Sequence, residues 1–138
     1  MKLIIDTNSI ISALIKDCDS RKIIVESGIG FYAPEEIIIE IYKYRELILK
    51  KSNLLKKDFD ILFKKLLEYI KIVPNFEILT KEKPARDIMD KIDKKDTAFI
   101  ACAISFNNDG IWSDDKHFKK QKIIKIWKTE DLLNLIKK

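Results

Sequence analysis

Short apolar runs alternate along this chain with longer segments whose apolar residues recur every three or four positions. A short apolar run between polar or turn residues predicts a buried strand, whereas the longer period predicts a helix with one buried face. Five strands are predicted in this way, at Lys2 to Ile5, Gly30 to Ala33, Ile72 to Val73, Ile111 to Trp112 and Ile123 to Ile126.

The predicted helices lie between these strands. The clearest is Leu54 to Ile70, where Phe59, Phe63 and Leu66 belong to one apolar stripe. Ser or Asn after Asp6 is predicted to cap the first helix, Ser20 the second and Thr129 the last. The remaining predicted helices are Ile10 to Lys16, Ser20 to Gly28, a long segment from Pro34 through Ile48, Pro84 to Lys91, Lys94 to Phe106 and the C-terminal stretch.

This alternation predicts an α/β fold, a three-layer α/β/α sandwich around a central, mainly parallel sheet of about five strands. The length of 138 residues favours a single domain over residues 1–138. In such sheets ligands bind beyond the carboxyl ends of the strands, where the strand order reverses. Functional side chains are therefore expected directly after strands or at the starts of helices.

Acidic residues stand at several such places. Asp6 follows the first strand, Asp114 and Asp115 follow the fourth, Glu40 lies on a helix beside apolar neighbours, and Asp96 begins an apolar helix. Each acid also has a structural explanation when it is considered alone. Asp96 could cap a helix, Glu40 could pair with Lys43 or Tyr44, and Asp115 could cap a turn. Together they predict an acidic pocket, which needs a cation because neighbouring carboxylates cannot all stay ionised. Oxygen ligands suit Mg²⁺ or Mn²⁺.

Charge and composition add a partner class. The net charge is +5, and the basic residues are lysine except for Arg21, Arg45 and Arg86. Lysine suits contacts with a phosphate backbone, although a biased genome or a hot habitat produces the same composition. Cys18 and Cys102 lie far apart and form no metal-type spacing. Nothing in the sequence resembles a disulfide framework, which favours a reducing cytoplasm. The first apolar run, Leu3 to Ile5, is too short for a membrane span.

Three stretches of the chain resemble the PIN-domain nucleases. Leu3-Ile4-Ile5-Asp6-Thr7-Asn8 is similar to the opening motif of that family, and Pro34 to Lys43 resembles the helix that carries its second acid. Asp96 to Ala103, together with Ile111 to Phe118, resembles the C-terminal half, where an acid begins a buried helix and a strand leads into a Thr/Ser-x-Asp motif. The order and spacing of the three stretches span nearly the whole chain.

The resemblance implies a site. Its catalytic and metal-binding acids would be Asp6, Glu40, Asp96 and Asp115, with Asp114 as the alternative to Asp115. Thr7, Asn8 and Ser113 would orient the carboxylates or water. Asp93, three residues before Asp96, would lie beside it and supply an extra ligand. His117 stands where many relatives carry another acid, and we expect it to face water at the start of a helix. RNA contacts are expected from basic residues near these motifs: Lys16, Arg21, Lys22, Lys43, Arg45, Lys116 and Lys119.

By the same resemblance the chain would be an endoribonuclease that cleaves single-stranded RNA with a metal-activated water. Many small PIN proteins resemble the toxin of a toxin–antitoxin pair, which implies an antitoxin partner and a homodimer. Two alternatives are open at this point. One is a Mg²⁺-dependent phosphatase or phosphotransfer receiver with an aspartate nucleophile, and the other is a catalytically inactive RNA-binding module.

Overall fold

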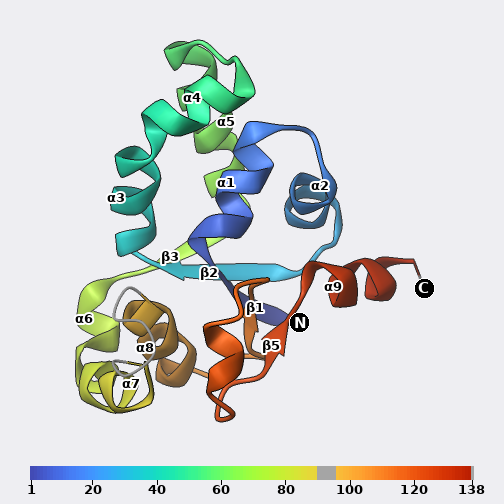
Figure 1. Cartoon of the computed structure of the whole chain (residues 1–138). Helices are drawn as coiled ribbons and strands as arrows, with labels where there is room; N and C mark the ends of the chain where they lie inside the picture. The colour runs from blue at the N-terminus through green and yellow to red at the C-terminus, as the bar shows by residue number, and fades with distance from the viewer. Residues whose placement is uncertain (90–95, 138) are drawn as a thin grey trace.

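A five-stranded parallel sheet forms the centre of the computed structural model, which describes residues 1–89 and 96–137 (Figure 1). The strand order is β3-β2-β1-β4-β5, and every neighbouring pair is parallel. The predicted α/β fold with a five-stranded parallel sheet is therefore confirmed. The strands are β1 (Lys2–Ile5), β2 (Gly30–Pro34), β3 (Ile70–Val73), β4 (Ile111–Trp112) and β5 (Ile126–Trp127).

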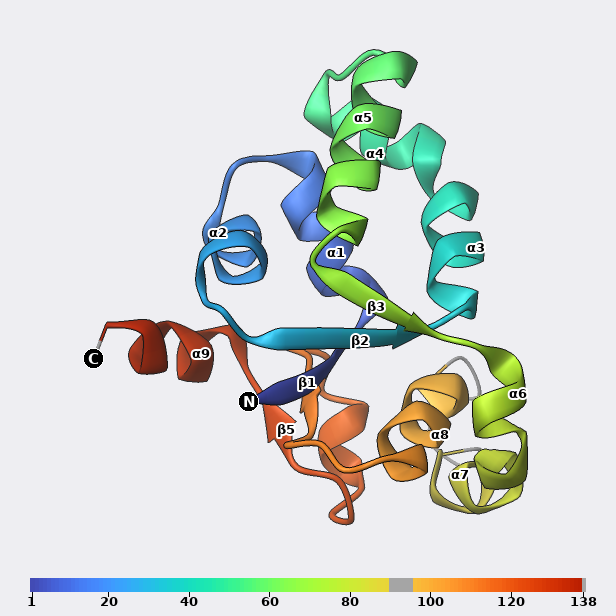
Figure 2. The ribbon, with the colours of Figure 1, turned by 180° about the vertical axis from the view of Figure 1, so that it is seen from behind.

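Helices cover both faces of the sheet. In Figures 1 and 2, α1 to α5 lie on one side and α6 to α8 on the other, while α9 lies near α2 beside the sheet. The helices on the first side are α1 (Thr7–Ile15), α2 (Asp19–Glu26), α3 (Glu36–Lys43), α4 (Arg45–Ser52) and α5 (Lys56–Leu67). The others are α6 (Asn75–Ile78), α7 (Glu82–Met89), α8 (Thr97–Ser105) and α9 (Thr129–Ile136), with the 3₁₀ helices η1 (Leu79–Lys81) and η3 (Phe118–Lys120).

The core lies between these layers because the central strands are apolar on both faces. Leu3, Ile4 and Ile5 of β1 are fully buried, as is Trp112 of β4. Apolar side chains on the covering helices complete the core, among them Phe59 and Phe63 of α5. An entirely buried central strand is expected when helices cover both faces of a parallel sheet.

The strand order reverses between β1 and β4. The chain leaves β1 for β2 on one side of it and returns to β4 on the other, where Ile4 pairs with Ile111 and Ile5 with Trp112. The residues that follow these two strands, Asp6 and Ser113, therefore lie side by side at the carboxyl ends of the strands. This is the place where open α/β sheets bind their ligands.

Several predicted boundaries were wrong for local reasons. Pro34 ends β2 instead of starting a helix, and the long predicted helix is divided at Tyr44 into α3 and α4. The predicted strand Ile123 to Ile126 overlaps β5 only at Ile126. Residues 123–125 form a loop, in which the Gln121 side chain bonds the backbone of Ile123 and Ile124. The start of the predicted Lys94 to Phe106 helix and the end of the Pro84 to Lys91 helix fall outside the described residues.

Candidate active site

Asp6 ends β1 and begins α1. Its Oδ1 atom accepts a hydrogen bond from the Ser9 backbone N–H at 2.9 Å, so Asp6 itself caps the helix and the predicted Ser or Asn cap was wrong. Only 4% of the residue is exposed. Burial raises the pKa of the carboxyl group, hydrogen bonds from Ser113 and Ser9 lower it, and the charge of Asp114 raises it further. The net result is a raised pKa, so ionised Asp6 is unfavourable unless a positive charge lies nearby.

Ser113 joins the ends of β1 and β4. Its hydroxyl is fully buried and donates a hydrogen bond to Asp6 Oδ2 at 2.5 Å. The same oxygen accepts a hydrogen bond from the Asp115 backbone N–H at 3.0 Å. One side chain therefore fixes the carboxylate of Asp6 and the backbone of the loop that carries Asp115.

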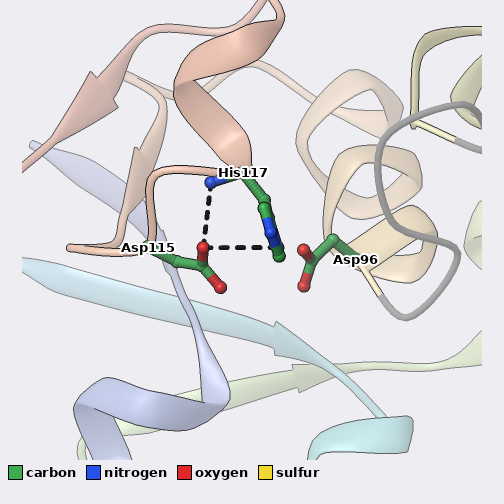
Figure 3. Close-up of side chains that lie close together, drawn as sticks. All are labelled: Asp96, Asp115 and His117. Atoms are coloured by element: carbon green, nitrogen blue, oxygen red, sulfur yellow. Dashed lines mark hydrogen bonds and ion pairs between the residues drawn. The ribbon is translucent and has the colours of Figure 1, made fainter.

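Asp115, Asp96 and His117 form a compact group at this edge (Figure 3). The Asp115 Oδ1 atom accepts a hydrogen bond from the His117 backbone N–H at 2.9 Å and lies 3.5 Å from His117 Nδ1. Asp96 immediately precedes α8, and its side chain makes no hydrogen bond to the first turn of that helix. One ligand atom from each of the three residues lies within 4.8 Å of the other two, close enough to hold a single metal ion.

Glu40 lies on α3 and is bonded to the residue that follows Asp6. Its Oε2 atom accepts a hydrogen bond from the Thr7 hydroxyl at 2.8 Å. Thr7 is the residue after Asp6 and is itself buried. Glu40 is thus held by the first residue of α1, which follows Asp6 directly.

Asp114 has a different place. Its two carboxylate oxygens accept hydrogen bonds from the backbone N–H and the hydroxyl of Thr129, at 2.9 and 2.6 Å. Asp114 therefore bonds the first residue of α9, whose N-cap is Lys128 and not the predicted Thr129, and the geometry favours Asp115 as the acid of the site.

The comparisons agree with this architecture. The family model for the PIN domain matches residues 4–136 of the chain. The chain belongs to the PIN-domain family. A comparison with curated proteins gave no match. PIN domains are generally metal-dependent nucleases and typically bind divalent metals, and the acidic group of this PIN domain is consistent with both properties.

The donor set fits a divalent cation. Asp96 and Asp115 offer carboxylate oxygens and His117 offers an imidazole nitrogen within one small volume. The Oδ2 atom of Asp96 has almost no exposure to solvent, and a carboxylate shielded in this way is stabilised by a bound cation. In this PIN domain the two remaining predicted acids, Asp6 and Glu40, are not members of the compact group. Asp6 is connected to it through Ser113, and Glu40 is bonded to Thr7, the neighbour of Asp6.

A small polar pocket opens next to Asp115. It has a volume of about 230 Å³. Asn8 lines it, and Asp93, predicted as an extra ligand, falls outside the described residues. The lining residues are Asn8, Ser9, Ser12, Ser20, Asp114 and Asp115.

The predicted RNA-binding side chains differ in availability. Arg21 donates a hydrogen bond from Nε to the Ala13 carbonyl, and Arg45 lies 4.0 Å from Glu46. Lys43 packs over the Tyr44 ring at 5.9 Å. The lysines at 16, 22, 43, 116 and 119 are exposed, as a surface that meets a phosphate backbone requires.

His117 directly precedes η3 and 42% of its side chain is exposed, as the sequence analysis expected. Its ring also lies against Asp115 and in reach of Asp96, a contact that the sequence analysis did not predict. The available signal was its position two residues after Asp115. In this loop the His117 N–H bonds the Asp115 carboxylate, and the His117 ring lies 3.5 Å from the same oxygen.

No helix within residues 1–89 and 96–137 is both long and apolar enough to cross a membrane.

Proposed function

We propose that this PIN domain is an endoribonuclease that hydrolyses single-stranded RNA with the help of Mg²⁺ or Mn²⁺. The observation that carries the proposal is the meeting of acids from distant parts of the chain at the switch point between β1 and β4. Asp115 follows β4 and Asp96 begins α8, yet both contribute to one group of possible metal ligands. Ser113 ties that group to Asp6 at the end of β1.

The residues divide into two roles. Asp96 and Asp115 would hold the cation directly, and Asp6 and Glu40 would supply further negative charge, through water or by closing on the ion. When bound, a divalent cation activates water for attack on a phosphodiester and stabilises the leaving oxygen. Ser113 and Thr7 keep the carboxylates of Asp6 and Glu40 in fixed orientations. Asn8 faces the pocket beside Asp115 and would contact water or substrate there.

The choice of RNA rests on charge and accessibility. The net charge of +5 and the exposed lysines favour a polyanion over a small neutral substrate. Lysines give little base-edge recognition, so the primary contacts would be with the backbone of an unpaired strand. A role as the toxin of a toxin–antitoxin pair, with an antitoxin that covers the site, a homodimer as the working form and a place in the cytoplasm, belongs to the same proposal.

The test is an assay of end-labelled single-stranded RNA with purified protein in Mn²⁺, Mg²⁺ or EDTA. Asp115→Asn is the decisive variant, since the amide can still accept the hydrogen bond from the His117 N–H that organises the loop. Asp114→Asn is the matched control, because its amide oxygen can still accept the hydrogen bond from the Thr129 N–H at the start of α9. We expect metal-dependent cleavage that Asp115→Asn lowers at least about 100-fold and Asp114→Asn leaves within about threefold.

Equal activity in EDTA and Mn²⁺, or equal losses in the two variants, would overturn the proposal. RNA binding without cleavage by the wild type would point instead to the inactive RNA-binding module. A stable phosphoryl group on the protein after incubation with a phosphate donor would point to the receiver-like alternative.

A further inference from the structure

His117 stands inside the group of acids and not beside it. In the view of Figure 3 its ring lies between the carboxylates of Asp115 and Asp96. A ring nitrogen lies within 4.8 Å of a carboxylate oxygen from each acid, and Nδ1 is 3.5 Å from Asp115 Oδ1. Ligand atoms on opposite sides of an octahedral ion are separated by about 4.2 Å, twice a bond length of about 2.1 Å. The three atoms can therefore reach one ion with small side-chain movements.

The backbone holds the ring in this place. His117 directly precedes η3, and its N–H is bonded to Asp115 Oδ1, so the position of the ring follows that of the acid. The next residue, Phe118, is buried in the core against Phe99 of α8, the helix that Asp96 begins. The segment that carries His117 is thus packed onto the element that carries Asp96, which fixes the distance between them.

From this geometry we infer that His117 is a nitrogen ligand of the metal ion and makes the site select Mn²⁺ over Mg²⁺. Mg²⁺ prefers oxygen ligands in a near-ideal octahedron, whereas Mn²⁺, a first-row transition metal, binds oxygen ligands and also accepts an imidazole nitrogen. A site with two carboxylates and one imidazole gains affinity for Mn²⁺ from the nitrogen and gains little for Mg²⁺. The inference rests on the proposed metal site, and it does not depend on RNA cleavage.

A spectroscopic test is favoured by the composition of the chain, which contains one histidine. In untagged protein loaded with Mn²⁺, a nitrogen coupling of directly bound imidazole in pulsed electron paramagnetic resonance can come only from His117. The matched control is the double variant Lys116→His with His117→Ala, which moves the ring by one residue to an exposed position. We expect the coupling in the wild type and none in His117→Ala or in the double variant.

Calorimetric titrations with Mn²⁺ and Mg²⁺ provide the second measurement. His117→Ala should weaken Mn²⁺ binding by about tenfold or more and change Mg²⁺ binding by less than about threefold. Far-ultraviolet circular dichroism would establish that the variant is folded. His117→Gln, which offers an oxygen in place of the nitrogen, should behave like the alanine variant in its ratio of Mn²⁺ to Mg²⁺ affinity.

The outcomes separate this inference from the proposed function. Absence of the nitrogen coupling in Mn²⁺-loaded wild type, or equal losses of Mn²⁺ and Mg²⁺ affinity in His117→Ala, would overturn the inference even if the protein cleaves RNA. Nitrogen coupling with selective loss of Mn²⁺ affinity would support it even if no RNA is cleaved, and in that case the proposed nuclease function would fall alone.

Discussion

Replacement of Ser113 by alanine tests whether one hydroxyl organises the site. The hydroxyl is completely buried and makes two hydrogen bonds, one to the Asp6 carboxylate and one from the Asp115 N–H. A hydrogen bond to a charged group contributes about 1.5–3 kcal/mol and a neutral one about 0.5–1.5 kcal/mol. Because alanine fills nearly the same volume, the lost bonds decide the effect. We expect the free energy of unfolding to fall by about 2–4 kcal/mol at pH 8.

The loss should depend on pH in a defined direction. Burial raises the pKa of Asp6 in the folded protein, and the Ser113 hydrogen bond lowers it, so the variant has the higher folded pKa. Above the ordinary value of 3.8, a folded state with the higher pKa binds more protons, and its stability falls more steeply as pH rises. The difference between wild type and Ser113→Ala is therefore largest at pH 8 and shrinks as the pH approaches 3.8.

Urea denaturation in EDTA at several pH values between 8 and 5 measures this difference. The dependence of the unfolding free energy on urea concentration should be unchanged, which shows that the same surface is exposed in both proteins. Ser105→Ala is the matched control, because that hydroxyl bonds the neutral Cys102 carbonyl away from the site and should cost about 1 kcal/mol or less at every pH. A Ser113→Ala effect below about 0.5 kcal/mol, or one as independent of pH as the control, refutes the reasoning.

Three other variants probe neighbouring features. Asp6→Asn keeps an acceptor for the Ser9 N–H and removes a buried charge. In EDTA at pH 8 the variant should therefore have a higher melting temperature and a free energy of unfolding about 0.5–2 kcal/mol above that of the wild type, and this gain should vanish toward pH 3.8. RNA cleavage by the variant should be lost. Asp114→Ala removes both hydrogen bonds to Thr129 at the start of α9, so urea denaturation should show a free energy of unfolding lower by about 1–2 kcal/mol. Metal binding measured by calorimetry should persist, and a variant that loses metal affinity as well as stability would contradict this. Gly110→Ala should lower the free energy of unfolding by about 3 kcal/mol or more, because Gly110 has a φ of +125° and a Cβ would lie 2.2 Å from the Lys125 carbonyl oxygen. A variant as stable as the wild type in urea denaturation would show that the segment before β5 can shift away.

The layered fold could be predicted because its signals are local. β1 was predicted with the observed bounds, since three consecutive apolar residues between polar ones favour a strand that is buried on both faces. The errors arose where tertiary contacts decide the structure. The Gln121 amide makes hydrogen bonds with the Phe118 carbonyl and with the backbone of Ile124, and residues 123–125 form a loop before β5. Composition alone gives no indication of that arrangement.

In the candidate site, too, features with local signals were predicted and features set by tertiary contacts were not. Asp6 and Asp115 were predicted from their positions after strands, which is a property of parallel sheets in general. The sequence left Asp114 and Asp115 as alternatives, because which of two adjacent carboxylates turns toward the site depends on where Thr129 lies, 15 positions further on. The placement of His117 likewise depends on how the loop closes onto Asp115.

The hydrogen bond between Ser113 and Asp6 also has a consequence for protein synthesis, because it spans 107 positions of the chain. A ribosome that has made β1, β2 and β3 has produced Asp6 and Glu40, but it has not yet made Asp96, Asp115 or the strand that places Asp115 at the sheet. Until that late segment emerges and pairs with β1, the nascent polypeptide lacks the compact acidic group. If the protein is the ribonuclease proposed above, a growing copy would not cut the messenger that encodes it until nearly the whole message has been read.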